Sequence, residues 1–409
     1  MADFAQLPPG SIPDVKPFQI CVDEAKLQHF RTLLELSPIG PTTFENTHAG
    51  RRYGVTREWL AKAKQAWLHD FDWRRSEARL NSFPSFRAPV RDDETGYTTE
   101  VHFLGLFSAR ADTVPIVFLH GWPGSICEFL DILDLLRAKY TPQTLPYHVI
   151  VPSLPGYGFS SGPPVDADYG VMQAAKAIHG LMLGLGFGKS GYLVQGGDLG
   201  SFVARAMALI YPECRGMHVN QMGFPPPGVD IGTRDAAEER AFQRATEAID
   251  TGLAFAMQQG TRAATMGLAL SASPLALLAW IGEKFLEFSD QDPPLDKILE
   301  GVMLYWLTDT YPRCLYHNRD MGDPKEEPKI ARYSVFADKA SLHLPYVAKP
   351  CGFSHFPHEV VPVPRSWAEK SVNLVTFSEH QRGGHFAALE RPNELLADVE
   401  EYVEKVWKP

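Results

Sequence analysis

The sequence has no long apolar run and no excess of basic charge. Its most apolar stretch, residues 274–281 (PLALLAWI), is flanked by serines and charges and is far shorter than the ~20 residues that a membrane-spanning helix needs. It therefore predicts a buried helix. The formal net charge of -10 argues against nucleic acid or an anionic membrane surface as a partner.

Cysteine is scarce, and its spacing is not that of a cross-linked or zinc-binding protein. The five cysteines are odd in number, scattered, and form no C-x-x-C pair. This pattern argues against a disulfide framework or zinc cluster and favours a reducing compartment, so we expect a cytoplasmic protein. The first 20 residues lack the basic and apolar regions of a secretory signal, so neither secretion nor a membrane anchor is expected.

The length of 409 residues, with 44% hydrophobic and 22% charged residues, suits a large catalytic domain with additions. The N-terminal part shows helical spacing over 23–36 and 55–70, with Thr56 as a plausible N-cap, and is proline-broken and arginine-rich up to about Arg91. We expect four segments: an N-terminal wrapping extension (1–110), a first core part (111–221), a helical lid (222–344) and a second core part (345–409).

Beyond about Thr98, short β-rich runs alternate with helical ones. This alternation predicts an α/β fold with a mostly parallel sheet. The expected strands are 116–119, 149–152, 192–194, 217–219, 346–348 and 373–377. Between 222 and 344 the alternation stops and helical stretches dominate, at 234–259, 275–288 and 295–310. Such an insertion predicts a lid over the carboxyl edge of the sheet.

The run Gly196-Gly197-Asp198-Leu199-Gly200 matches the nucleophile elbow, in which small residues allow a tight turn between a strand and a helix. The expected strand 192–194 and a helix over 201–211 supply that context. A carboxylate is ionised at neutral pH and attacks carbon without a base, so Asp198 predicts a nucleophile that forms an alkyl ester. The competing interpretation, a helix N-cap, does not explain the flanking glycines.

A second elbow match places Ser160 between Gly158 and Gly162, but Pro163 and Pro164 follow where a helix should begin. We therefore interpret Ser160 as a structural loop residue.

His385 follows the expected strand 373–377 and precedes an amphipathic last helix. That is the chain position of the histidine in the order nucleophile, acid, histidine, so it is the predicted base that activates water. Between Lys349 and Arg365 the only carboxylate is Glu359. Glu359 is by elimination the predicted orienting acid, against the alternative of a solvated surface glutamate.

The segment His120-Gly121-Trp122-Pro123-Gly124 follows the expected strand 116–119. It is suited to present the backbone N–H of Trp122 toward the site. Together with the N–H of Leu199, it predicts an oxyanion hole for the attack of water on the ester.

The motifs HGWPGS, PSLPGYGFS, QGGDLGS and GGHFAALERP, with residues 17–20 and 80–84, resemble the microsomal-type epoxide hydrolases, including their soluble fungal members. The resemblance covers nearly the whole chain. It implies an α/β-hydrolase fold, Asp198 as nucleophile, His385 as base, Glu359 as acid and a lid-mediated homodimer. No metal or organic cofactor is implied, and the aromatic and methionine-rich lid favours a hydrophobic small-molecule substrate.

In this family two lid tyrosines bind and protonate the epoxide oxygen. The matching positions here hold Phe255, six residues before Thr261, and Asn318, twelve residues after Trp306. Three alternatives stay open. A neighbouring phenol has taken over, with Tyr316 the nearest candidate and Tyr311 or Tyr305 further off, although each is by default a packing aromatic. Alternatively, the substrate is a haloalkane or activated ester, whose leaving group needs only a hydrogen bond from the Asn318 amide. The third, a non-catalytic ligand-binding protein, is the least favoured because Asp198, Glu359 and His385 are all present.

Overall fold

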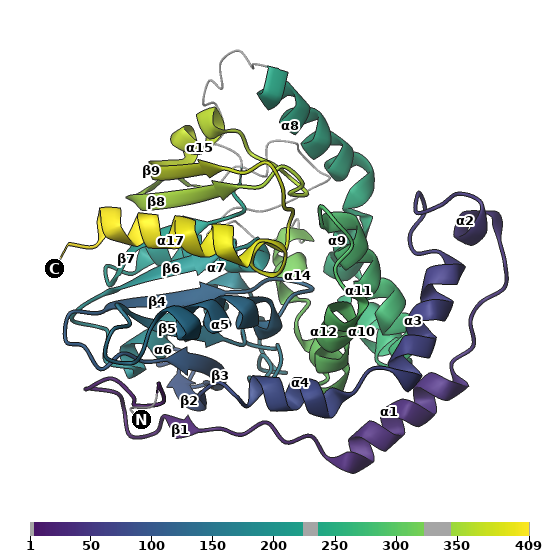
Figure 1. The fold of residues 1–409 in the computed structure, drawn as a ribbon, viewed down its shortest axis with the longest axis horizontal. Coiled ribbons are helices and arrows are strands. Elements are labelled where there is room, and N and C mark those ends of the chain that lie inside the picture. The colour runs from purple at the N-terminus through teal and green to yellow at the C-terminus, as the bar shows by residue number, and fades with distance from the viewer. Residues whose placement is uncertain (1–3, 224–235, 323–344, 409) are drawn as a thin grey trace.

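The computed structural model describes residues 4–223, 236–322 and 345–408. They include a nine-stranded sheet in the order β1-β2-β3-β5-β4-β6-β7-β8-β9. From β5 to β9 all neighbouring strands are parallel, whereas β1, β2 and β3 add an antiparallel edge. The predicted α/β class with a mostly parallel sheet is confirmed (Figure 1). The strands are β1 (Lys16–Pro17), β2 (Ser85–Arg91), β3 (Thr98–Leu106), β4 (Val114–Leu119), β5 (Tyr147–Pro152), β6 (Tyr192–Gly196), β7 (Cys214–Val219), β8 (Val347–His355) and β9 (Val372–Glu379).

The central strands are apolar because helices cover both faces of the sheet. Every residue of β4, β5 and β6 is buried, as expected for parallel strands between two helical layers. Helices α6 (Val171–Gly184) and α7 (Asp198–Ile210) pack against each other on one face. Helices α5 (Leu130–Lys139) and α17 (Pro392–Val406) lie together on the other (Figure 1).

A helical insertion separates β7 from β8 in the chain, and we use this name for residues 236–322. The ends of the predicted lid, 224–235 and 323–344, lie outside the described residues. Its elements are α8 (Ala236–Glu247), a π-helical turn (Ala248–Gly252), α9 (Ala254–Thr261), α10 (Ala263–Leu270), α11 (Pro274–Phe288), α12 (Leu295–Leu307), α13 (Thr310–Arg313) and α14 (Tyr316–Gly322). Helix α11 is largely buried and contains the apolar stretch.

The N-terminal helices lie along the insertion (Figure 1). They are α1 (Glu24–Leu36), α2 (Phe44–Thr47), α3 (Arg57–His69) and α4 (Trp73–Leu80). The Thr56 hydroxyl accepts from the N–H of Trp59 and caps α3, as predicted. A Cβ at Gly282 would lie 2.5 Å from the Trp59 ring, so glycine is what lets α3 and α11 approach so closely. Within the described ranges, no single helix has the length and apolarity to cross a membrane, although α10 and α11, bent by 119°, pass that test as a pair.

Several element boundaries differ from the prediction. Strand β8 runs to His355 rather than stopping at 348, because register shifts accommodate Pro350 and Gly352 inside it. The helix predicted over 234–259 is interrupted by the π-helical turn. Helix α4 and strands β1 to β3 were missed. Arginines mask the apolar pattern of the short helix α4, which Asp72 caps, and two arginines and a proline interrupt that of β2.

Candidate active site

Asp198 is the first residue of α7, directly beyond β6. Its φ of +47° lies in the left-handed region, which is unusual for a residue with a side chain and typical of a strained functional turn. The turn needs glycine around it, since a Cβ at Gly200 would lie 2.2 Å from the carbonyl oxygen of Leu119. The helix N-cap is Gly197, so the N-cap interpretation of Asp198 does not hold.

His385 stands between two carboxylates. Its Nε2 lies 3.3 Å from Oδ2 of Asp198, and its Nδ1 lies 2.6 Å from Oε1 of Glu359. Glu359 follows β8 and His385 follows β9, so neighbouring parallel strands deliver both side chains to one edge of the sheet. The structure thus brings together the three residues singled out from the sequence. Glu359 is 3% exposed, which rules out the solvated-glutamate alternative.

The charges of Asp198, His385 and Glu359 shift the pKa values of Asp198 and His385. Burial alone would lower the pKa of His385, but the charge of Glu359 and the hydrogen bonds with both carboxylates raise that pKa well above its ordinary value. Burial alone would raise the pKa of Asp198, yet the hydrogen bond and charge of His385 lower it. In the free enzyme these interactions favour an ionised Asp198 and a protonated His385, and the part of the raised pKa of His385 that comes from the charge of Asp198 is lost once Asp198 is esterified.

Two backbone N–H groups point at the Asp198 carboxylate. The N–H of Trp122 donates to Oδ1 at 2.6 Å, and the N–H of Leu199 also bonds the carboxylate. The loop that carries Trp122 is fixed by His120, whose Nε2 accepts from the N–H of Leu154 at 3.1 Å. Donors in these places meet the geometric requirement of an oxyanion hole.

Ser160 has a structural role in a loop and is not placed as a nucleophile. It is 3% exposed, and its hydroxyl donates to the carbonyl of Ser153 at 2.6 Å and accepts from the N–H of His102 at 2.9 Å. Ser160 therefore ties loop 153–160 to strand β3, in agreement with the structural interpretation.

The two insertion positions that lack tyrosine carry different contacts. Phe255 stacks on Trp122, with the ring centroids 5.2 Å apart and an interplanar angle of 18°. Asn318 is 3% exposed, and its amide donates to Oε1 of Gln259. Gln259 in turn donates to the hydroxyl of Tyr311 at 3.2 Å. The Asn318 amide is thus engaged inside the insertion.

The phenols considered as replacements are all buried. Tyr305 donates its hydroxyl to the carbonyl of Gly124 at 2.9 Å. Tyr316 is 5% exposed and packs edge-on against Tyr169 at 5.1 Å. It also interacts electrostatically with Tyr305, which itself senses the charge of Asp198.

Sequence reasoning missed the residues that hold the loops of Glu359 and His385. Asp290, after α11, accepts from the N–H of Gly383 at 3.1 Å and pairs with Nε2 of His358 at 3.1 Å. The carbonyl of Phe288 accepts from the N–H of His385 at 3.0 Å. The insertion therefore fixes the loops of both Glu359 and His385.

Arg244 of α8 makes a second such connection. Its guanidinium donates to the carbonyl of Glu359 at 2.9 Å and to that of His358 at 3.0 Å. In the sequence Arg244 is an ordinary charge on an amphipathic helix, and no local pattern distinguishes it.

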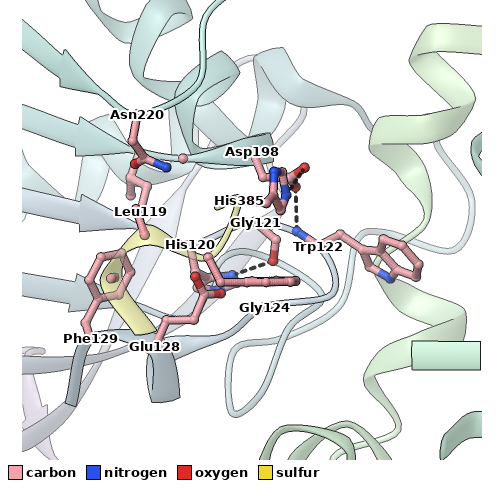
Figure 2. Close-up of a pocket in the computed structure, with 14 residues that line it drawn as sticks. Leu119, His120, Gly121, Trp122, Gly124, Glu128, Phe129, Asp198, Asn220 and His385 are labelled. Carbon is pink, nitrogen blue, oxygen red and sulfur yellow. Dashed lines mark hydrogen bonds and ion pairs between the residues drawn. The ribbon is translucent and has the colours of Figure 1, made fainter. Parts of the chain in front are cut away.

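A small pocket lies beside Asp198 and His385 (Figure 2). It is also lined by Trp122, Glu128 and Asn220, and Glu128 is a further carboxyl that the sequence did not single out. Across the three described ranges, no group of three or more His, Cys, Asp or Glu side chains is arranged to hold a metal ion.

Comparison with known proteins agrees with this geometry. Residues 15–129 match the family described as "Epoxide hydrolase N terminus", and residues 114–246 match "alpha/beta hydrolase fold". A "Putative epoxide hydrolase" of Dothistroma septosporum is 46% identical over 409 residues, which are 99% of this chain and 93% of that protein.

Solved structures give the same result. The epoxide hydrolase of Aspergillus niger is 46% identical with a TM-score of 0.89, over 99% of this chain and all of that one. The juvenile hormone epoxide hydrolase of Bombyx mori is 25% identical with a TM-score of 0.77, over 99% of both chains. From this identity along almost its full length, the chain is an enzyme of the microsomal-type epoxide hydrolase family, with the α/β-hydrolase fold.

Proposed function

We propose that the enzyme opens hydrophobic epoxides through a covalent ester on Asp198. The observation that carries this proposal is the Asp198–His385–Glu359 chain, with two backbone N–H groups on the nucleophile. Oδ1 of Asp198 is held by Trp122, which leaves Oδ2 to attack the epoxide carbon. The C–O bond of the ring breaks, and the departing oxygen takes a proton from an acid in the pocket.

In the second step water attacks Cγ of the esterified Asp198. His385 takes a proton from that water at Nε2, and Glu359 holds Nδ1 and stabilises the imidazolium. The negative charge of the tetrahedral intermediate develops on Oδ1, where the N–H groups of Trp122 and Leu199 stabilise it. Collapse breaks the bond from Cγ to the alcohol oxygen, which takes the proton from Nε2 of His385 and leaves as the diol. The acid of Asp198, now with one oxygen from water, loses its proton to solvent while the acid of the first step regains one.

We assign the acid of the first step to Tyr316, with the helical insertion acting as a lid. Phe255 carries no hydroxyl, and the Asn318 amide is engaged by Gln259. The Tyr305 hydroxyl already donates to a carbonyl. The electrostatic interaction of Tyr316 with Tyr305 supports its place near the nucleophile.

Mass analysis after a single turnover in H₂¹⁸O tests the covalent route. With styrene oxide as substrate, the peptide that holds Asp198 is expected to gain one ¹⁸O, and the Asp198→Asn variant is expected to form no ester. An unlabelled peptide after complete turnover would contradict the route.

The acid is tested separately with Tyr316→Phe, with Tyr305→Phe as the matched control. Loss of a general acid typically costs ~10²–10⁴-fold, so ester formation from styrene oxide is expected to slow by at least 10²-fold in Tyr316→Phe. Ester formation from benzyl bromide, whose leaving group needs no proton, should change little. Equal rates for both substrates in the variant and the native enzyme would exclude Tyr316 as the acid.

Pocket, assembly and location complete the proposal. The stacked rings of Trp122 and Phe255 favour an apolar substrate. The exposed side chains of Met257 and Leu268 on the insertion, 40% and 78% exposed, support the homodimer that the family implies, and light scattering should give twice the chain mass.

All five cysteines are free thiols, which supports the expected cytoplasmic location. A fluorescently tagged chain should then distribute through the cytoplasm.

A further inference from the structure

The side chain of Glu128 is held in a fixed position beside Asp198. It lies on the 3₁₀ turn Ile126–Phe129, where its carboxylate accepts from the N–H of Ser125 at 3.0 Å and completes a capping box. Its Oε1 lies where residue 124 would carry a side chain, because a Cβ at Gly124 would come within 1.4 Å of that atom. Glycine at 124 therefore reserves the space that the Glu128 carboxyl occupies.

The Glu128 carboxyl lines the same small pocket as Asp198 and His385, the two residues that act in hydrolysis of the ester. Glu128, Asp198, His385 and Asn220 all line it (Figure 2). The pocket offers about 10 Å³ to the centre of a water molecule, which is roughly the space that one ordered water needs, and such a water also requires two to four polar partners. These side chains supply that number.

Glu128 is a neutral acid at physiological pH. Burial raises its pKa to about 8, and the negative charge of Asp198 adds to the rise, while the charge of His385 and the Ser125 N–H act against it. The titratable groups that face it are Asp198 of α7, His385 of the loop after β9, and Tyr305 of α12. With Oε1 accepting from Ser125, the proton belongs on Oε2, which is thereby a hydrogen-bond donor.

We propose that Glu128 binds and orients the water molecule that hydrolyses the Asp198 ester. This inference rests on the proposed function. The Oε2–H of Glu128 donates to one lone pair of the water, and the second lone pair attacks Cγ of Asp198. The water gives its proton to Nε2 of His385, so Glu128 itself neither gains nor loses a proton.

Two substitutions separate this role from a structural one. Glu128→Gln keeps an acceptor for Ser125 and a donor for water, so hydrolysis of the ester is expected to stay within about threefold of the native rate at pH 7. Glu128→Leu fills the space without a donor and is expected to slow hydrolysis by about 10-fold or more, the worth of one hydrogen bond of about 1.4 kcal/mol. Ester formation should be unchanged in both.

The pH dependence of ester hydrolysis distinguishes hydrogen bonding to water from a purely structural role of Glu128. Ionisation of Glu128 removes the donor, so hydrolysis by the native enzyme should decline above about pH 8. Glu128→Gln, which cannot ionise, should lose that decline. Glu300→Gln is the matched control for loss of a buried carboxyl elsewhere, since Glu300 is 6% exposed on α12, and it should keep the native profile.

Quenched-flow mass spectrometry on the full-length enzyme, with styrene oxide, measures both steps. An ester that accumulates on Asp198 in Glu128→Leu, and not in Glu128→Gln, supports the inference. Hydrolysis at the native rate in Glu128→Leu, or an alkaline decline that persists in Glu128→Gln, overturns it. If Glu128→Leu does not fold, the Glu128→Gln profile decides alone. Absence of any Asp198 ester in the native enzyme would instead contradict the proposed function.

Discussion

Replacing Glu359 with glutamine tests how the base is held. The bond from Nδ1 of His385 to Oε1 of Glu359 is 2.6 Å long and buried. A hydrogen bond to a charged group contributes about 1.5–3 kcal/mol, against about 0.5–1.5 kcal/mol for a neutral one. Glutamine keeps an acceptor and removes the charge, so the expected loss is about 1–2 kcal/mol. That corresponds to about 5–30-fold in the rate of ester hydrolysis.

The loss should fall on the second step alone. Ester formation uses the Asp198 carboxylate, whereas hydrolysis needs His385 to accept a proton and become an imidazolium that Glu359 stabilises. The charge of Glu359 raises the pKa of His385, so Glu359→Gln lowers it. Neutral His385 then persists to lower pH, and the acid limb of the hydrolysis step should move to lower pH.

Stopped-flow tryptophan fluorescence can follow formation and decay of the ester with styrene oxide, since Trp122, whose backbone N–H contacts Asp198, contributes to the signal of the eight tryptophans. Glu359→Gln should form the ester at the native rate and then accumulate it. Glu369→Gln is the control, because that half-exposed carboxylate pairs with the exposed Arg365. An acid limb that stays in place, or equal slowing of both steps, would refute the orienting role of Glu359.

Four further outcomes are expected. Phe255→Tyr places a phenol beside Trp122 and should accelerate ester formation from styrene oxide if the absent phenol limits that step; no gain in the stopped-flow rate would favour an acid elsewhere. In Gly121→Ala the new Cβ would lie 2.2 Å from the side chain of Asp198. Because a displacement of about 1 Å can cost ~10²-fold in rate, kcat/KM should fall by at least that factor. An unchanged kcat/KM would contradict this packing argument. Thr56→Ala removes the N-cap of α3 and should lower the free energy of unfolding by about 1 kcal/mol in urea titration, with activity retained. Burial lowers the pKa of His148 and that of His218 to about 4, below the ordinary ~6.5. The stability that the neutral histidines give above pH 6.5 is therefore lost as the pH falls toward 4, by up to about 1.4 kcal/mol per pH unit for each histidine. A melting temperature that does not fall over this range would contradict this prediction.

Local features made the turn at Asp198 predictable from the sequence. The elbow is five consecutive residues, and its glycines are required by contacts such as that between Gly200 and Leu119. Parallel strands deliver their following loops to one edge of the sheet, so the chain order alone placed Asp198, Glu359 and His385 together. Central strands were equally readable, because burial on both faces leaves apolar runs.

Edge and irregular elements could not be read in this way. Strand β2 contains Pro89 and four of its residues are only half-buried or exposed, so it lacks the continuous apolar run of β4. Strand β8 was cut short because Pro350 and Gly352 resemble chain breakers, whereas the register shifts beside them keep the strand in the sheet. These outcomes depend on partner strands that are distant in the sequence.

The insertion has a structural role that the sequence did not indicate. Through Asp290, Phe288 and Arg244 it fixes the loops that carry His385 and Glu359. The two positions that lack tyrosine differ in their relation to these anchors. Phe255 packs on Phe288, with the ring centroids 5.8 Å apart, as well as on Trp122, whereas the amide of Asn318 contacts Gln259. A substitution at Asn318 is therefore expected to leave the loops of Glu359 and His385 in place, whereas a substitution at Phe255 also changes a contact of the residue whose carbonyl holds His385.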